Sequence, residues 1–112
     1  MSGPLRLLVV SHSCILPVNR CIYEVLAKQT DFTIQLLLPS HYTSDFDGQR
    51  LVLTEPKAAG VQTSVGRTIL TQHGSLYLYR SGLRRAIREF QPDVLFLDEE
   101  PWSLVALQTL VC

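Results

Sequence analysis

The segment Leu5–Val10 constrains the fold more than any other, because all of its residues except Arg6 are apolar. A continuous apolar run of this length is typical of a strand that is buried on both faces of a parallel sheet. A small polar segment at residues 11–14 ends the run, and Pro17 precedes the next apolar pattern. The chain is therefore predicted to open with a strand, a sharp turn and the start of a helix.

A helix is predicted after Pro17, because apolar residues there recur at i, i+3, i+4, i+7 and i+8. These residues are Val18, Cys21, Ile22, Val25 and Leu26. We expect this stripe to lie on the sheet. Phe32–Leu38 is the second predicted strand, and Pro39 ends it. Together the three elements form a βαβ unit, whose strands should be parallel and whose crossover should be right-handed.

The periodicity weakens between residues 40 and 75, where only a loop at 41–48 and short strands at 50–54, 61–65 and 75–79 are predicted. Regular order returns at Tyr79. The apolar spacing of Leu83, Ala86, Ile87 and Phe90 predicts a second amphipathic helix, which ends before Pro92 because proline cannot continue it.

A third buried strand is predicted at Val94–Leu97, and a third helix at Trp102–Val111. The fold class is therefore α/β, with three layers: a Rossmann-like parallel sheet that carries helices on both faces. The last helix runs to Cys112 without a glycine cap or a polar turn. We therefore expect residues 1–112 to be a single domain that is truncated at its C-terminus.

Composition narrows the classes of partner and compartment. The formal net charge is zero, so no global field would attract nucleic acid, and no nucleic-acid partner is expected. No apolar run approaches the roughly 18 residues that span a bilayer. The N-terminus lacks a basic region and a cleavage site of the secretory type, which favours the cytoplasm. The three cysteines form no CxxC pair, so we expect reduced thiols and no metal site.

The acidic segment Asp98-Glu99-Glu100 directly follows the third predicted strand. Ligands of open α/β sheets bind beyond the carboxyl ends of the strands, so these carboxylates could accept hydroxyl hydrogen bonds or act as acid and base. Alternatively the segment is a solvated loop that places acids near the start of a helix.

The loop after the first strand is the second candidate site. His12 could act there as a base or donate to a phosphate, and Asn19 and Arg20 could bind an anion or a sugar hydroxyl. The competing interpretations are a histidine bonded to the backbone, helix capping and simple exposure. Cys14 lies in the same loop, but a small buried thiol is commoner than a nucleophile.

Arg80, Arg84 and Arg88 recur every four residues and could contact an anionic membrane surface, although an ordinary solvated helix face is the commoner outcome. The glycine-rich motifs of dinucleotide-binding and Walker proteins are absent from the sequence, as are HExxH and GxSxG.

Two stretches carry a resemblance to a known family. The first is Leu5–Arg20 with its loop SHSCILPVNR, and the second is Tyr79–Gln108, which contains the more specific phrase FQPDVLFLDEEPWSL. Both are similar to the N-terminal half-domain of a retaining glycosyltransferase of family 4, which has the GT-B architecture. The resemblance covers most of the chain and is weakest at 54–75. It implies two facing Rossmann-like domains, of which this one holds mainly the acceptor. The partner domain binds the nucleotide sugar through an Ex7E motif, which this sequence lacks.

The resemblance also implies roles for residues. Ser11, His12, Asn19 and Arg20 would line the cleft from the first loop, and Glu100 would join them from the acidic segment. Many family members carry His-x-His-Glu-Pro after the later strand. Here that phrase reads Phe96-Leu97-Asp98-Glu99-Glu100-Pro101, so Asp98 or Glu99 would replace the histidine as the catalytic polar group.

The implied reaction is transfer of a sugar from a nucleotide-sugar donor to a hydroxyl of a sugar, lipid or small-molecule acceptor. It proceeds with retained configuration and without a required metal or other cofactor. By itself this half would be inactive. Two other classes stay open: a self-contained flavodoxin-like binding or regulatory domain, and an enzyme of another Rossmann class that uses Asp98 and Glu99 as acid and base.

Overall fold

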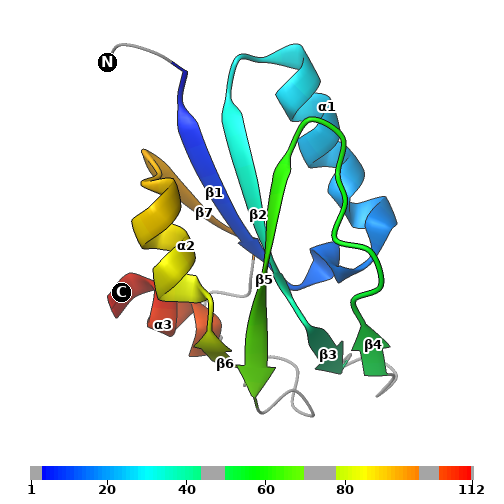
Figure 1. The fold of residues 1–112 in the computed structure, drawn as a ribbon, viewed down its shortest axis with the longest axis vertical. Coiled ribbons are helices and arrows are strands. Elements are labelled where there is room, and N and C mark those ends of the chain that lie inside the picture. Colours follow the sequence, from blue (N-terminus) through cyan, green and yellow to red (C-terminus); the bar gives the residue numbers. More distant parts are fainter. Residues whose placement is uncertain (1–3, 44–49, 70–77, 99–103, 112) are drawn as a thin grey trace.

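The computed structural model describes residues 4–43, 50–69, 78–98 and 104–111 (Figure 1). The elements in chain order are β1 (Arg6–Ser11), two 3-10 helices (Ser13–Ile15 and Pro17–Arg20), α1 (Cys21–Gln29), β2 (Thr33–Pro39), β3 (His41–Thr43), β4 (Arg50–Val52), β5 (Gln62–Ile69), β6 (Leu78–Ser81), α2 (Leu83–Phe90), β7 (Val94–Asp98) and α3 (Leu104–Val111).

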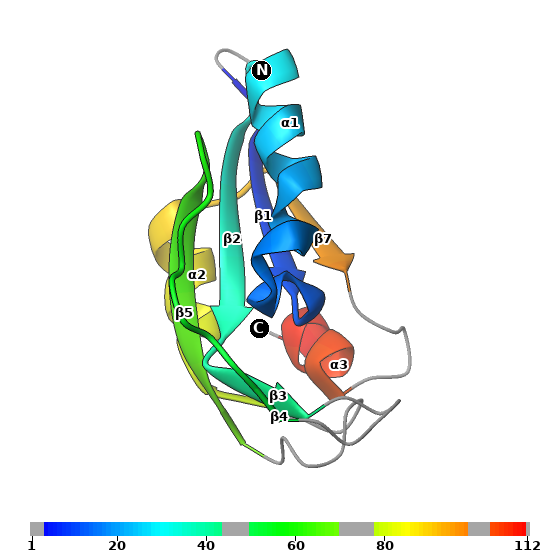
Figure 2. The ribbon, with the colours of Figure 1, turned by 90° about the vertical axis from the view of Figure 1, so that its right-hand side faces the viewer.

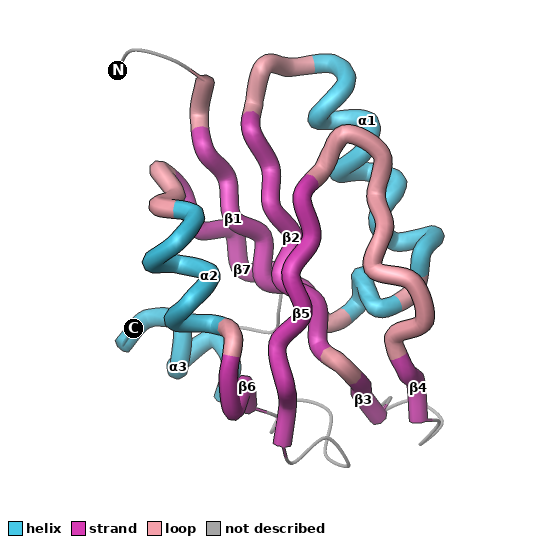
Figure 3. The backbone as a smooth tube through the Cα atoms, in the orientation of Figure 1, coloured by secondary structure: helices cyan, strands magenta, loops and turns pink. Residues whose placement is uncertain are grey.

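One five-stranded sheet forms the centre of the molecule, with the strand order β6-β5-β2-β1-β7. β1 pairs in parallel with β2 on one side and with β7 on the other, and β5 is parallel to β2. Only β6 pairs antiparallel, with β5. β3 and β4 form a separate small hairpin, which lies at the lower end of the sheet in Figure 3. The predicted α/β class with a mainly parallel sheet is confirmed.

Helices cover both faces of this sheet (Figure 2). On the α1 face, Tyr23 packs with Leu7, Val9 and Leu36. On the other face, Leu8, Val10 and Leu37 pack with buried side chains of α2 and α3. The alternating residues of β1 therefore serve two separate cores, which explains its uninterrupted apolar run. None of the helices within the described ranges is long and apolar enough to cross a membrane.

Helix α2 follows its predicted pattern. Leu83, Ala86 and Phe90 are buried. The Arg6 guanidinium anchors the end of the helix, since its Nε and Nη2 atoms donate to the Phe90 carbonyl at 2.9 and 2.7 Å. Gln91 then adopts a left-handed conformation with φ 51° just before Pro92. The helix therefore ends where proline predicts.

The weakly patterned region contains more strand than predicted. Strand β3 begins at His41, where a loop was predicted, and β5 continues to Ile69, beyond the predicted 61–65. Tyr79 lies in β6. Two glycines allow β5 and β6 to approach: a Cβ on Gly66 would lie 2.5 Å from a ring carbon of Tyr79, and one on Gly82 would lie 2.8 Å from the Gly66 Cα. Such close approaches leave no periodic signal.

The predicted apolar stripe of α1 is wrong. Val18, Cys21, Ile22 and Val25 are exposed, and Ile22 is 69% accessible. The side chains that turn inward are instead Arg20 and Tyr23, with Leu26 and Ala27 partly buried beside them. Residues 17–20 form a 3-10 helix, so the α-helix itself begins only at Cys21. The buried Arg20 side chain then sets which face meets the sheet.

The prediction that Val94–Leu97 is a buried strand is also wrong in part. β7 exists, but among the described strands it is the last of the sheet and pairs with β1 alone. Val94, Leu95 and Phe96 are 43%, 39% and 49% exposed. An apolar run indicates a strand but does not specify how many neighbours it has.

Candidate functional site

The candidate site lies where β1 and β7 end side by side. The register pairs Ser11, the last residue of β1, with Asp98, the last residue of β7. The chain leaves β1 through α1 on one face of the sheet and reaches β7 through α2 on the other. Such a point, at the carboxyl ends of neighbouring parallel strands with connections in opposite directions, is where open α/β sheets bind ligands.

The Asp98 carboxylate is held by two donors. The Ser11 hydroxyl and the Tyr23 hydroxyl each donate to its Oδ2 atom at 3.0 Å. The Ser11 hydroxyl also lies 3.0 Å from that of Ser13. The second carboxylate oxygen, Oδ1, accepts no hydrogen bond from the part of the chain that the structure describes. Asp98 is half-buried, so its carboxylate is oriented by the protein and still reachable.

Two neighbouring groups stay protonated at neutral pH. Burial, reinforced by the adjacent Asp98 carboxylate, raises the pKa of Tyr23 well above its ordinary value. Burial likewise raises the pKa of the Cys14 thiol. Tyr23 is therefore a permanent hydrogen-bond donor to Asp98. Cys14 is a thiol, which disfavours its use as a nucleophile.

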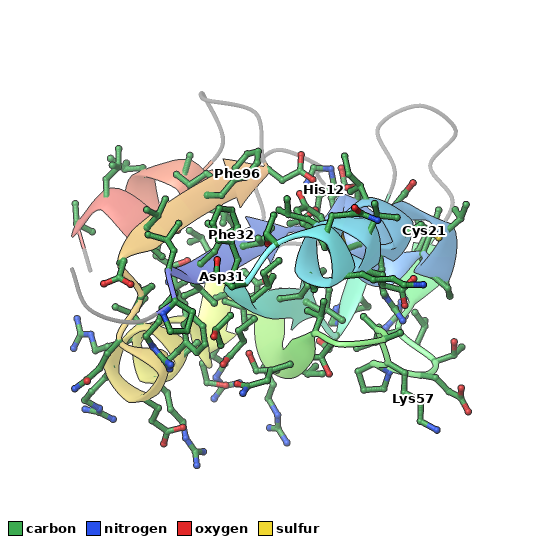
Figure 4. All side chains as sticks on the ribbon, turned by 90° about the horizontal axis from the view of Figure 1, so that it is seen from above. His12, Cys21, Asp31, Phe32, Lys57 and Phe96 are labelled. Carbon is green, nitrogen blue, oxygen red and sulfur yellow. The ribbon has the colours of Figure 1, made fainter. Side chains whose placement is uncertain are left out.

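The loop between β1 and α1 is tied to itself. The Asn19 side-chain amide donates to the Ser13 carbonyl at 2.7 Å, and the Cys14 thiol donates to the Asn19 carbonyl at 3.4 Å. The His12 ring stacks on Tyr42 of β3 with centroids 4.5 Å apart (Figure 4 labels His12). These contacts tie the loop to itself and to β3, and Asn19 is exposed. The binding roles of His12 and Asn19 stay predictions.

Arg20 occupies a different place from the predicted one. Its side chain is 1% exposed and donates to four backbone carbonyls, those of Cys14, Ile15, Glu55 and Lys57, at 2.6–3.2 Å. The guanidinium thus joins the first loop to the segment before β5. We expected it to line the cleft, and this burial leaves it no ligand-facing group.

Glu99 and Glu100 lie outside the described residues, so the prediction for these two carboxylates stays a prediction.

Tyr23 is a site residue that the sequence did not predict, because it lies outside the apolar stripe that we expected to face the sheet. Tyr23 lies three residues after Arg20, so the two side chains share one helix face. This spacing predicts that Tyr23 faces the sheet only once Arg20 is known to be buried.

An apolar groove of about 460 Å³ runs between α1 and β7 and reaches Asp98. Its lining residues are Ile22, Tyr23, Val25, Leu26, Gln29, Phe96 and Asp98. None of these carries a positive charge. Within the described ranges, no cluster of three or more histidine, cysteine, aspartate or glutamate side chains is arranged to hold a metal ion.

Comparison with known proteins identifies no relative: no family model, no curated protein and no solved structure matches this chain.

Proposed function

We propose that this chain is the acceptor-binding domain of a retaining glycosyltransferase with a Rossmann-like fold. In this proposal the acceptor hydroxyl donates a hydrogen bond to Asp98, and a nucleotide sugar is the donor substrate. The observation that carries the proposal is the Asp98 carboxylate, which Ser11 and Tyr23 orient at the carboxyl ends of β1 and β7.

The chemistry of the described residues supports a neutral, hydroxyl-bearing ligand. A carboxylate accepts hydrogen bonds and repels anions, while the Arg20 guanidinium is engaged with carbonyls in the interior. A hydroxyl that donates to a carboxylate becomes more nucleophilic, because negative charge beside it stabilises its partial loss of the proton. Such a group suits an acceptor hydroxyl that attacks a sugar carbon.

Strand order favours this proposal over the flavodoxin-like alternative. When the parallel strands are numbered along the chain, β5-β2-β1-β7 is the order 3-2-1-4, which matches the first four strands of the Rossmann order 3-2-1-4-5-6. Flavodoxin-like sheets have the order 2-1-3-4-5. Cytoplasmic location, peripheral membrane contact and the enzyme class all remain predictions from the sequence.

Binding of a simple glycoside to the 112-residue chain tests the proposal. We expect methyl β-D-glucoside to shift amide signals of residues 11–14 and 98 in a two-dimensional NMR titration. Asp98→Asn should weaken this binding at least tenfold, because a neutral amide is a poorer acceptor and leaves Tyr23 and Ser11 without their anionic partner.

The matched control is Asp31→Asn, which changes an exposed carboxyl before the amino end of β2, whereas the candidate site lies at the carboxyl ends of β1 and β7 (Figure 4 labels Asp31). It should leave the titration unchanged. Equal affinities of the Asp98→Asn and wild-type chains would contradict the proposal.

A further inference from the structure

The groove between α1 and β7 places one carboxylate, that of Asp98, against a mostly apolar surface. Ile22 and Val25 of α1 are 69% and 58% exposed, and Phe96 of β7 is 49% exposed (Figure 4 labels Phe96). All three line the groove that reaches Asp98. A groove of about 460 Å³ lies in the size range of small-molecule sites, which are mostly apolar with a few polar groups.

The two chemical parts of the groove are arranged in sequence along its length. Tyr23 and Asp98 form the polar end of the groove. From there its exposed apolar side chains continue along α1 as far as Gln29. From Ile22 to Gln29 the helix rises about 10 Å, since each residue adds 1.5 Å. A ligand that fills this space needs a polar head at the Asp98 end and an extended apolar tail.

The head must donate hydrogen bonds rather than carry negative charge. Asp98 Oδ2 is already engaged by Ser11 and Tyr23, and the described residues that line the groove include no lysine, arginine or histidine. A hydroxyl can donate to the carboxylate, whereas a phosphate or sulfate would meet a like charge without a cation to offset it. The groove therefore selects by charge as well as by polarity.

We propose that the groove between α1 and β7 binds the apolar tail of an amphiphilic acceptor whose hydroxyl head reaches Asp98. This inference rests on the proposed function and deepens it, because it names the class of acceptor: a neutral lipid-like alcohol or glycoside. A water-soluble sugar without a tail would use only one end of the site.

Three probes separate the head from the tail. n-Octyl β-D-glucoside, kept below its micelle concentration, has both; methyl β-D-glucoside has the head alone; and n-octyl sulfate has the tail with an anionic head. Each buried methylene strengthens binding roughly fourfold. A tail that buries three methylenes should therefore make octyl glucoside bind on the order of fiftyfold more tightly than methyl glucoside.

Variants of the groove wall test where the tail lies. Phe96→Ala and Val25→Ser come from the two opposite walls, and each should lower octyl glucoside affinity at least fivefold in an NMR or calorimetric titration. Ile69→Ala removes a side chain that is 42% exposed on β5, outside the groove, and should leave the affinity unchanged. Because the wall side chains are exposed, circular dichroism should show both variants folded.

The outcomes distinguish the two proposals. Equal affinities for octyl and methyl glucoside would overturn the amphiphile inference, as would octyl sulfate binding as tightly as octyl glucoside. A retained tail effect combined with no response to Asp98→Asn would instead overturn the proposed role of Asp98. Fiftyfold tighter binding that falls in both wall variants and in Asp98→Asn would support both.

Discussion

Arg20 shows how one residue can take a structural role that its charge does not predict. A guanidinium in a loop near a candidate cleft suggests anion binding, but here four backbone carbonyls surround it in the interior. The bonds to Cys14 and Ile15 are buried and those to Glu55 and Lys57 are partly buried, so removal of the guanidinium would leave at least the first two carbonyls desolvated without this donor. Arg20 thus holds the first loop and the segment before β5 together, and with them the position of Tyr23.

Replacing Arg20 should therefore cost stability. We expect Arg20→Ala to lower the free energy of unfolding by about 3 kcal/mol or more, because it leaves buried carbonyls without partners. Arg84→Ala is the matched control, since Arg84 is exposed on α2, and it should change stability by no more than about 0.5 kcal/mol. Urea denaturation monitored by circular dichroism measures both. A loss below 1 kcal/mol for Arg20→Ala would contradict the structural role.

Asp98 and Tyr23 are separated by 75 residues and meet through the packing of α1 on the sheet. Asp98 itself could be predicted as a site residue, since acids directly after an apolar strand lie at the ligand-binding edge. Of its two donors, Ser11 was placed at the cleft through the family resemblance, whereas Tyr23 was not predicted, because it lies outside the expected apolar stripe. The sequence therefore indicates Asp98 and Ser11, and the structure adds Tyr23.

At the scale of elements, the existence of helices and strands was better predicted than their orientation. β1, β2, α1, α2, β7 and α3 all form near the predicted positions. Helix α1 nevertheless turns its predicted apolar stripe to solvent, and β7 lies at an edge. Periodicity identifies the type of element, whereas its phase depends on what it packs against.

Which face of α1 packs on the sheet can be tested by replacing isoleucine with alanine at an exposed and at a buried position. Ile22→Ala should change the free energy of unfolding by less than about 1 kcal/mol, because Ile22 is 69% exposed. Ile34→Ala in β2 should lower it by about 2–5 kcal/mol, because Ile34 is 2% exposed and its removal leaves a cavity. If Ile22→Ala were as destabilising as Ile34→Ala, the predicted stripe would face the sheet after all.

At the scale of the whole molecule, one sheet separates two cores, and the core on the α1 face contains two titratable groups that matter for stability. The core on the α1 face includes both Tyr23 and Cys14, whose pKa values are raised mainly by burial. In each case the folded chain holds the proton more tightly than the unfolded chain does. Their protonated forms therefore favour folding.

Stability should consequently fall at alkaline pH. Well below pH 9 both groups are protonated in the folded and unfolded chain, so they contribute almost no pH dependence there. As the pH rises above 9.0 and 10.0, the ordinary values of Cys14 and Tyr23, the unfolded chain releases protons first and is favoured. Urea titrations at pH 8, 9, 10 and 11 should show a decline that Tyr23→Phe makes shallower between pH 10 and 11.

At pH 8, Tyr23→Phe should lower the free energy of unfolding by about 1 kcal/mol, because it removes the hydrogen bond to Asp98. The decline of each chain above pH 8 is therefore compared with its own value at pH 8. Identical slopes for Tyr23→Phe and the wild-type chain above pH 10 would show that Tyr23 ionises equally in both states. The raised pKa would then be wrong.

The sequence by itself determined the α/β class, the βαβ opening and the place of Asp98 at the end of a strand, because apolar runs and proline positions act over a few neighbouring residues. Tertiary structure alone decided the strand order, the buried place of Arg20, the face of α1 that meets the sheet and the contact of Tyr23 with Asp98. These features depend on side chains far apart in the chain competing for the same interior, and that competition leaves no local pattern.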